Sequence, residues 1–329
     1  MNALIKPDGR IDFGIIEKPI HVVNYMDYIL ETPMGFRVSR ITKSLRFNQF
    51  NFIGIMGPDI MAGLAVVDLN MVGNGFFYIY DRKNKTLVET KKIAPPFCAS
   101  IKTNPSNMDS RFSFGGLQIS FQGNKIKARG KDISLDAELD LNGLNPLRLC
   151  TRAGYRGWVY TEKTTPVSIS GTMTCKGKSW NLSSPENLAL VDWSAGFMRR
   201  NTFWNWAAIA ATLPCGRCFG LNLASGVNET GFTENAVWID NTMVKVDTVN
   251  FIFDPDDLMK PWKITSYDKK INLEFLPENK RDEKTNALIL ASRFTQLMGC
   301  YSGTITTDLG ETIVIPSLPG YAEDHYAKW

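Results

Sequence analysis

Short runs of β-branched and aromatic residues recur along the whole chain, and polar turn residues separate them. The expected strands include 45–56, 62–70, 75–80, 86–91, 117–121, 125–129 and 133–139, and later 204–212, 218–224, 236–240, 243–253, 293–299 and 302–306. Runs of this length between such turns are typical of an antiparallel sandwich or barrel. Helix signals are few, and a short helix is expected at 24–30. The pattern therefore predicts an all-β protein.

A polar, proline-containing stretch, 181–187, interrupts the pattern near the middle of the chain. Such a stretch is typical of a linker, and each side of it carries enough strands for one antiparallel barrel. A chain of 329 residues is also long enough to form two cores of ordinary size. We therefore expect two β-barrels packed together, in an N-terminal domain of residues 1–182 and a C-terminal domain of residues 183–329.

Composition excludes several partners. The net charge of +4 is spread over isolated basic doublets, which argues against nucleic-acid binding. The N-terminus lacks the apolar core of a secretory signal, and no stretch reaches the ~20 apolar residues of a membrane span. The six irregularly spaced cysteines favour reduced thiols. We expect a cytoplasmic protein without a transmembrane segment, and the sequence leaves its oligomeric state open.

Metal and cofactor signals are also missing. The chain has only two histidines, His21 and His325, and its lone Cys215-x-x-Cys218 has no second ligand pair. Neither a phosphate-binding loop nor a dinucleotide-binding glycine motif occurs. The sequence therefore predicts no metal and no cofactor.

The segment 191–235 has an unusual alternation of aromatic, aliphatic and amide residues. In a strand, Trp204 and Trp206 share one face and Asn205 takes the other; Asn222 likewise opposes two leucines. Either the indole and leucine faces pack outside or between the domains, so that Asn205 and Asn222 point into a barrel, or the arrangement is reversed. In the first case, a few polar groups in an apolar lining would form a small-molecule pocket.

Two carboxylates, Asp192 and Glu234, lie nearest to this segment in sequence. In an apolar lining a carboxyl group has a raised pKa and serves as a proton donor near neutrality. Alternatively, both carboxylates pair with Arg199 or Arg200 as an ion pair at the domain joint, and the residues alone favour this interpretation. His325, in the aromatic tail that ends at Trp329, is either a pocket acid or base or a packed ring.

The same stretches resemble the domain-of-unknown-function family DUF2804. The matching segments are 192–196, 204–207, 220–223, 234–235, 296–303 and 323–329. More distantly, the chain resembles a two-barrel, lipocalin-like group of carotenoid hydratases and related cyclases. That group carries an Asp-His-x-Trp motif at the start of its second barrel. Here Asp192 is retained, whereas Trp193 and Ala195 replace the histidine and the tryptophan.

The resemblance implies two lipocalin-like barrels and an apolar cleft that contains an acid. The functional hypothesis is acid-catalysed hydration, cyclisation or isomerisation of an isoprenoid- or polyketide-like molecule. Its catalytic residues would be Asp192, Glu234 and His325. Its ligand-binding residues would be Trp193, Arg199, Trp204, Asn205, Trp206, Asn222, Asn235 and Glu323. The alternatives are a non-catalytic binding or carrier protein for a hydrophobic ligand, and a scaffold whose aromatic residues only pack the domain joint.

Overall fold

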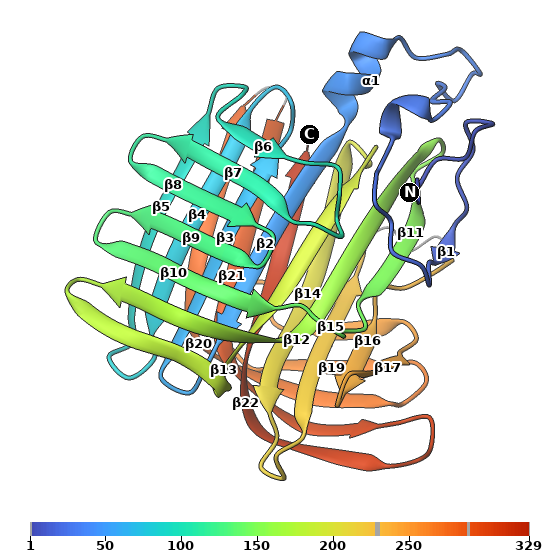
Figure 1. Cartoon of the computed structure of the whole chain (residues 1–329). Helices are drawn as coiled ribbons and strands as arrows, with labels where there is room; N and C mark the ends of the chain where they lie inside the picture. Colours follow the sequence, from blue (N-terminus) through green and yellow to red (C-terminus); the bar gives the residue numbers. More distant parts are fainter. Residues whose placement is uncertain (1, 228–230, 288–289, 329) are drawn as a thin grey trace.

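The computed structural model of the chain describes residues 2–227, 231–287 and 290–328. Strands account for 63% of the structure and helices for 3%. The strands form two antiparallel sheets, one nearly closed into a barrel and one shaped as a half-barrel, which lie against each other (Figure 1). The predicted all-β, barrel-like class is confirmed. Trp329 lies outside the described residues.

The first sheet has 13 strands, in the order β5-β4-β3-β2-β13-β12-β10-β9-β8-β7-β6, with β11 joined to β12 and β1 joined to β11. Its strands are β1 (Gly14–Ile15), β2 (Asn48–Met56), β3 (Ile60–Asp68), β4 (Gly73–Asp81), β5 (Thr86–Ala94), β6 (Ala99–Ile101), β7 (Asp109–Phe114), β8 (Leu117–Gln122), β9 (Lys125–Gly130), β10 (Ile133–Asp140), β11 (Leu147–Ala153), β12 (Gly157–Cys175) and β13 (Lys178–Gly196).

The second sheet has nine strands, in the order β17-β16-β15-β14-β22-β21-β20-β19-β18. Its strands are β14 (Asn201–Thr212), β15 (Cys218–Ser225), β16 (Ala236–Ile239), β17 (Thr242–Lys245), β18 (Val249–Ile252), β19 (Trp262–Ser266), β20 (Ile271–Ala287), β21 (Leu290–Thr306) and β22 (Thr312–Lys328).

Helical structure is confined, in the described residues, to two short elements near the N-terminus. The 3-10 helix η1 (Tyr25–Asp27) occupies the middle of the helix expected at 24–30. The helix α1 (Arg40–Arg46) begins after Ser39, whose Oγ accepts a hydrogen bond from the Thr42 amide at 3.1 Å. A serine in this position satisfies a backbone donor that the first turn leaves unpaired. The strand expected from residue 45 therefore begins only at Asn48.

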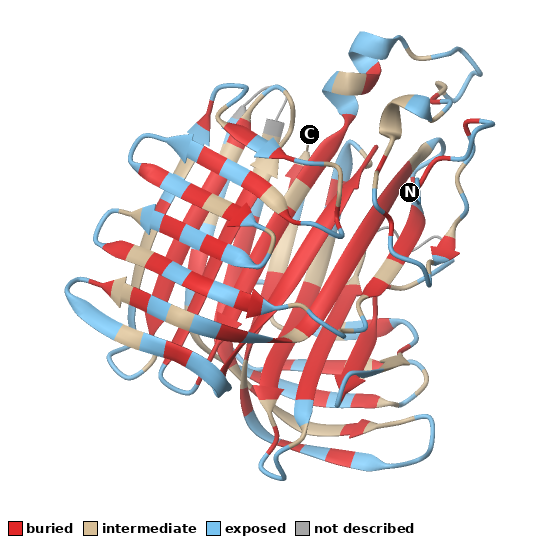
Figure 2. Cartoon of the chain, viewed as in Figure 1, coloured by how far each residue is buried: buried red, intermediate tan, exposed pale blue. Residues whose placement is uncertain are grey.

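Burial follows the position of each strand. The strands β8 to β10 alternate between buried and exposed residues, whereas β2, β3 and β4 are buried along most of their length (Figure 2). Alternation indicates a strand with one face in solvent, and continuous burial indicates a strand covered on both faces. One face of β2, including Ile53 and Ile55, packs in the first barrel. The other, including Phe52 and Met56, packs against the second sheet.

The chain passes from the first sheet to the second between Gly196 and Asn201. The polar stretch 181–187, expected to be a linker, lies within β13, which pairs with β12 and β2. The expected division at 182/183 therefore falls inside a strand of the first sheet. The barrel interior of the second sheet is a separate core that includes Ile209, Leu221 and Leu273.

The two sheets meet over a mixed aromatic and aliphatic layer that includes Trp206, Met298 and Tyr321. The Tyr321 hydroxyl lies 2.8 Å from the Ile55 carbonyl oxygen of the first sheet, and Tyr78 crosses to the second sheet by donating to Gln296 Oε1 at 2.6 Å. All six cysteines are free thiols. Among the described residues, no helix has both the length and the apolar character needed to cross a bilayer.

Candidate functional site

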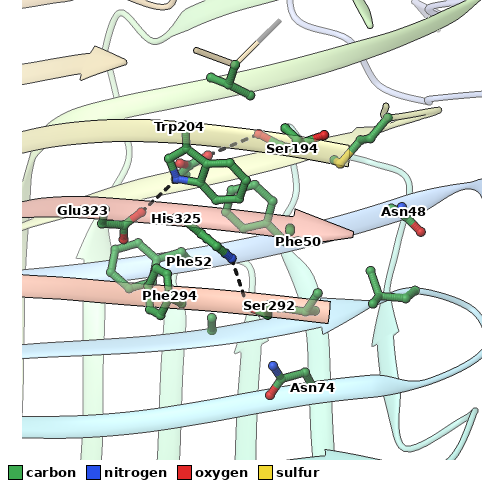
Figure 3. Close-up of a pocket in the computed structure, with 18 of the residues that line it drawn as sticks. Asn48, Phe50, Phe52, Asn74, Ser194, Trp204, Ser292, Phe294, Glu323 and His325 are labelled. Atoms are coloured by element: carbon green, nitrogen blue, oxygen red, sulfur yellow. Dashed lines mark hydrogen bonds between the residues drawn. The ribbon is translucent and has the colours of Figure 1, made fainter. Parts of the chain in front are cut away.

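A cavity of about 430 Å³ lies between the two sheets. Its first-sheet wall includes Phe50 and Phe52 of β2, and its second-sheet wall includes Trp204 and Trp206 of β14 (Figure 3). Residues two apart in a strand point to the same face, which explains why each strand contributes a pair of aromatic rings. The cavity is therefore mainly apolar and lies between the sheets rather than inside one barrel.

Of the predicted site residues, those that line this cavity are Asp192, Trp204, Trp206, Glu234, Glu323 and His325. The structure thus brings together side chains from β13, β14, β22 and the segment before β16. The remaining predicted residues lie away from the cavity wall.

Lys163 joins the two carboxylates that the sequence singled out. It stands opposite Asp192 in the β12–β13 pairing, and its Nζ bonds Asp192 Oδ2 and lies 3.3 Å from Glu234 Oε2. The three side chains are between 6% and 8% exposed. Asp192 also accepts a hydrogen bond from Ser194 Oγ at 3.3 Å. The ion-pair interpretation is correct in kind, but its cation is Lys163 rather than Arg199 or Arg200.

In this cluster, burial and the neighbouring opposite charges shift the pKa values of Asp192 and Lys163 in opposite directions. Burial raises the pKa of Asp192, the Glu234 carboxylate raises it further, and the Lys163 ammonium counteracts both. Burial disfavours the charged form of Lys163, but the two carboxylates outweigh burial and raise its pKa. With all three groups ionised, the cluster carries one net negative charge inside the protein.

Glu323 is the other buried acid of the cavity, 8% exposed. Trp204 Nε1 donates to its Oε2 at 3.1 Å, and Gln296 Nε2 donates to its Oε1 at 2.6 Å. Within the described part of the chain, no Lys or Arg nitrogen lies within ion-pair distance of it. Burial raises the pKa of Glu323 to about 7, although the two donors lower it. Glu323 is therefore a carboxyl group that exchanges its proton near neutral pH.

His325 lies two residues further along β22, on the same wall (Figure 3). Its ring sits 4.0 Å from the Trp204 ring and 4.6 Å from the Phe294 ring, measured between centroids. Its Nε2 lies 3.1 Å from Ser292 Oγ, whereas Nδ1 is buried and has no hydrogen-bond partner among the described residues. Burial and the positive charge of Arg281 lower the pKa of His325 to about 3. The imidazole is therefore neutral under ordinary conditions.

Two predicted ligand-binding amides have structural roles. Asn222 accepts from Trp206 Nε1 at 2.9 Å and donates to the Glu234 carbonyl at 2.8 Å, so it holds the cavity wall from behind. Asn235 accepts from the Ala224 amide at 2.7 Å and donates to the Asp247 carbonyl at 2.8 Å. The side-chain amides of Asn222 and Asn235 are therefore engaged in hydrogen bonds to backbone groups and to the Trp206 indole.

The remaining three residues are not part of the cavity lining either. Trp193 is a core residue of the first barrel, 6.0 Å from the Tyr160 ring. Asn205 donates to Asp324 Oδ1 at 3.0 Å, on the face opposite to the two indoles. Arg199 belongs to the connection between the sheets, where its carbonyl accepts from Thr202 Oγ.

Neither arrangement considered for the two asparagines is correct. The indoles lie between the sheets, as the first arrangement required, but Leu221 and Leu223 fill the second barrel. Asn222 is therefore on the same side as Trp206, because its cross-strand partner Ala208 is also on that side. In β14 the asparagine faces away from the cavity, whereas in β15 the asparagine faces the same side as the indoles. Only the β14–β15 pairing register shows this difference.

Sequence reasoning missed Lys163, Tyr78 and several aromatic wall residues. Lys163 had a signal, since it and Glu162 are adjacent charged residues in the buried part of a strand. Gln296 lies in one of the segments that carried the family resemblance. Phe50, Phe52 and Phe76 have no signal beyond their alternation. Among the described residues, no group of three or more His, Cys, Asp or Glu side chains is placed to bind a metal.

The fold and the cavity define a two-sheet, lipocalin-like protein. The chain belongs to the domain-of-unknown-function family DUF2804, whose family model matches residues 1–329. No curated protein matches it.

Solved structures with the same fold have very different sequences. Kievitone hydratase from Nectria haematococca matches with a TM-score of 0.54 and 10% identity, over 100% of this chain and 98% of that one. A putative AttH from Nitrosomonas europaea matches with a TM-score of 0.53 and 14% identity, over 91% and 96%. CghA with Sch210972 matches with a TM-score of 0.53 and 8% identity, over 99% and 97%. At these identities the likeness concerns the fold.

Proposed function

We propose that this protein binds an apolar, isoprenoid- or polyketide-like molecule in the cavity between its sheets and catalyses a proton-transfer reaction on it. Acid-catalysed hydration, cyclisation and isomerisation all begin with such a step. The observation that carries the proposal is the Glu323 carboxyl group, buried in an apolar wall with a pKa of about 7. A general acid works best when its pKa lies near the working pH.

Glu323 takes the donor role that the sequence suggested for Asp192. Asp192 shares the Lys163 ammonium with Glu234, whereas the side-chain donors to Glu323 among the described residues are the neutral N–H groups of Trp204 and Gln296. Once Glu323 has given its proton to an alkene or an oxygen of the ligand, Trp204 and Gln296 stabilise the carboxylate that remains. These hydrogen bonds strengthen as the charge develops.

The rest of the wall suits a ligand that becomes positively charged. The Trp204 and Trp206 rings line the same cavity, and indole faces attract cations. The Asp192–Lys163–Glu234 cluster adds a net negative charge nearby. In this proposal Asp192 and Glu234 stabilise the cation, and the neutral His325 ring forms part of the cavity wall that contacts the ligand.

The name of one solved structure with the same fold supports the proposal. One structure with this fold is named a hydratase. A carrier without chemistry would use the same cavity, but it would not need an acid with a pKa near neutrality. Glu323 therefore favours the enzyme over the carrier.

The test uses protein purified from its own host and examined by native mass spectrometry, followed by extraction of any bound molecule. The extracted molecule, or the lipophilic extract of the host, is then incubated with the protein in deuterium oxide. We expect a product that carries solvent deuterium. Glu323→Gln keeps the shape and is expected to lower turnover by a factor of about 100 to 10,000 while ligand binding persists.

The matched control is Glu274→Gln, which makes the same change at an exposed position of β20. Its turnover should equal that of the unmodified protein. Normal turnover in Glu323→Gln would refute the catalytic role of Glu323. Ligand retention with no deuterium uptake in any variant would select the carrier.

A further inference from the structure

The segment that precedes β2 exposes an unusual set of large apolar side chains. Met34 is 81% exposed, Phe36 72%, Ile41 76% and Leu45 45%. They lie on α1 and on the loop before it, within twelve consecutive residues. Single exposed apolar residues are ordinary, but a group of this kind in one segment marks an interaction surface.

The same segment is basic and free of acids. No Asp or Glu occurs between Thr32 and Pro58, whereas that stretch contains four of the 37 Lys and Arg residues. Its charge equals the net charge of the whole chain, so the rest of the sequence is balanced. Arg37, Arg40 and Arg46 are exposed. Lys43 is different, because its Nζ donates to the Met26 and Tyr28 carbonyls and fixes α1 to the body of the protein.

This surface lies next to the end of the cavity where lining residues such as Phe50, Leu69 and Val72 are partly exposed. Helix α1 ends two residues before Asn48, and the first residues of β2, Asn48 to Phe50, line the cavity. Leu69 and Val72, beside the β3–β4 turn, are partly exposed and line the same end. The Asn70 side chain in that turn bonds the Phe47 carbonyl directly after α1. Figure 1 shows α1 projecting beyond this end of the sheets, where β22 also ends.

We propose that the segment 33–46 docks on an anionic lipid surface and holds the cavity opening against the bilayer. Exposed Phe, Ile, Leu and Met side chains enter the boundary between headgroups and acyl chains, and arginines beside them attract anionic headgroups. An apolar ligand then passes between the membrane and the cavity without crossing water. The proposal concerns binding, and it holds for a carrier as well as for an enzyme.

A membrane fits these residues better than a nucleic acid does. A nucleic-acid surface needs the arginines alone, since phosphate contacts dominate its affinity. It would leave unexplained the exposure of Met34, Phe36 and Ile41, which are the most exposed large apolar residues of the segment. Arginines and exposed apolar side chains lie together on one short segment. This combination fits a lipid bilayer, which has a charged headgroup layer above an apolar interior.

The experiment is co-sedimentation of the full chain with phosphatidylcholine vesicles, with and without about one third phosphatidylserine. We expect binding to the anionic vesicles only. Arg37→Gln/Arg40→Gln/Arg46→Gln should weaken it by roughly a hundredfold. Phe36→Ser/Ile41→Ser should weaken it by roughly tenfold or more. Because all five positions are exposed, circular dichroism should show an unchanged fold.

Matched controls make the same changes elsewhere on the surface. Lys83→Gln/Lys85→Gln/Lys176→Gln removes the same charge from exposed turn positions, and Leu309→Ser removes an apolar side chain that is 97% exposed. Both should bind like the unmodified protein. The proposal is overturned by absence of vesicle binding, by equal loss in the controls, or by binding that Phe36→Ser/Ile41→Ser leaves intact while an oligonucleotide competes for the site. Since no turnover is measured, failure here leaves the proposed function standing.

Discussion

Removing the Lys163 ammonium is the sharpest test of the buried ion cluster. In Lys163→Met the side chain keeps its approximate length, but Asp192 and Glu234 lose the cation that lies between them. The cluster keeps one net negative charge only if one carboxyl group takes up a proton. We therefore expect a loss of stability that depends on pH.

The magnitude follows from the cost of that proton. Bringing a carboxyl group with an ordinary pKa near 4 to its neutral form at about pH 7 costs ~4 kcal/mol, because a tenfold change in proton activity corresponds to ~1.4 kcal/mol. Breaking a buried ion pair on one side typically costs about 3–5 kcal/mol. The two arguments agree, and we expect the free energy of unfolding to fall by about 3–4 kcal/mol near neutral pH.

The sign of the pH dependence follows from proton uptake. In the variant the folded state binds a proton more tightly than the unfolded chain does, since the folded carboxyl pKa is raised further. Stability then falls as the pH rises from the unfolded pKa, near 4, through the folded one. At about pH 5 the same protonation costs only ~1.5 kcal/mol, so the loss should shrink to about 1–2 kcal/mol.

The assay is urea unfolding of both proteins near pH 7 and near pH 5. Lys127→Met is the control, because its Nζ lies 2.9 Å from Asp136 in a pair whose side chains are 61% and 68% exposed. An exposed pair of this kind contributes at most about 1 kcal/mol. A loss of less than about 1 kcal/mol for Lys163→Met near pH 7, or an equal loss at both pH values, would show that Lys163 does not neutralise the two carboxylates.

Two further predictions concern the cavity itself. Trp204→Phe keeps a ring beside His325 but removes the Nε1 donor to Glu323 Oε2. Because that donor stabilises the carboxylate, the pKa of Glu323 should rise above about 7 by the equivalent of ~1–2 kcal/mol. A pH titration followed by infrared spectroscopy measures this pKa, and a lowered value would contradict the role given to Trp204. Ala224→Leu places a larger side chain in the cavity wall, so less space is left for a ligand. Binding of the apolar dye anilinonaphthalene sulfonate, measured by fluorescence titration, should weaken roughly tenfold. Unchanged binding would show that the dye binds outside the cavity.

Local pattern predicted the strands well where one face of a strand lies in solvent. The hairpin of β8 and β9, whose residues alternate between buried and exposed, falls almost where alternation and turn residues place it. The shared face of Trp204 and Trp206 is likewise a property of one strand, and both indoles line the cavity as that face requires.

The pairing between strands could not be read in the same way. Lys163 meets Asp192 because β12 and β13 pair across two irregularities, between Thr164 and Val167 and between Ser168 and Ser170. A shift of one residue would send Lys163 to the other face. Asn222 depends in the same way on the β14–β15 register. Helix α1 has exposed apolar residues and no amphipathic stripe toward the core, so periodicity offers no sign of it.

The proposed function depends most directly on Glu323 releasing its proton near neutral pH inside an apolar cavity. Infrared difference spectroscopy measures it directly, as the carbonyl band of a protonated carboxyl group that is present in the unmodified protein and absent in Glu323→Gln. As the pH rises, this band should disappear with a midpoint at about pH 7. A midpoint near the ordinary glutamate value of about 4.3, or a band that Glu323→Gln leaves unchanged, would contradict it.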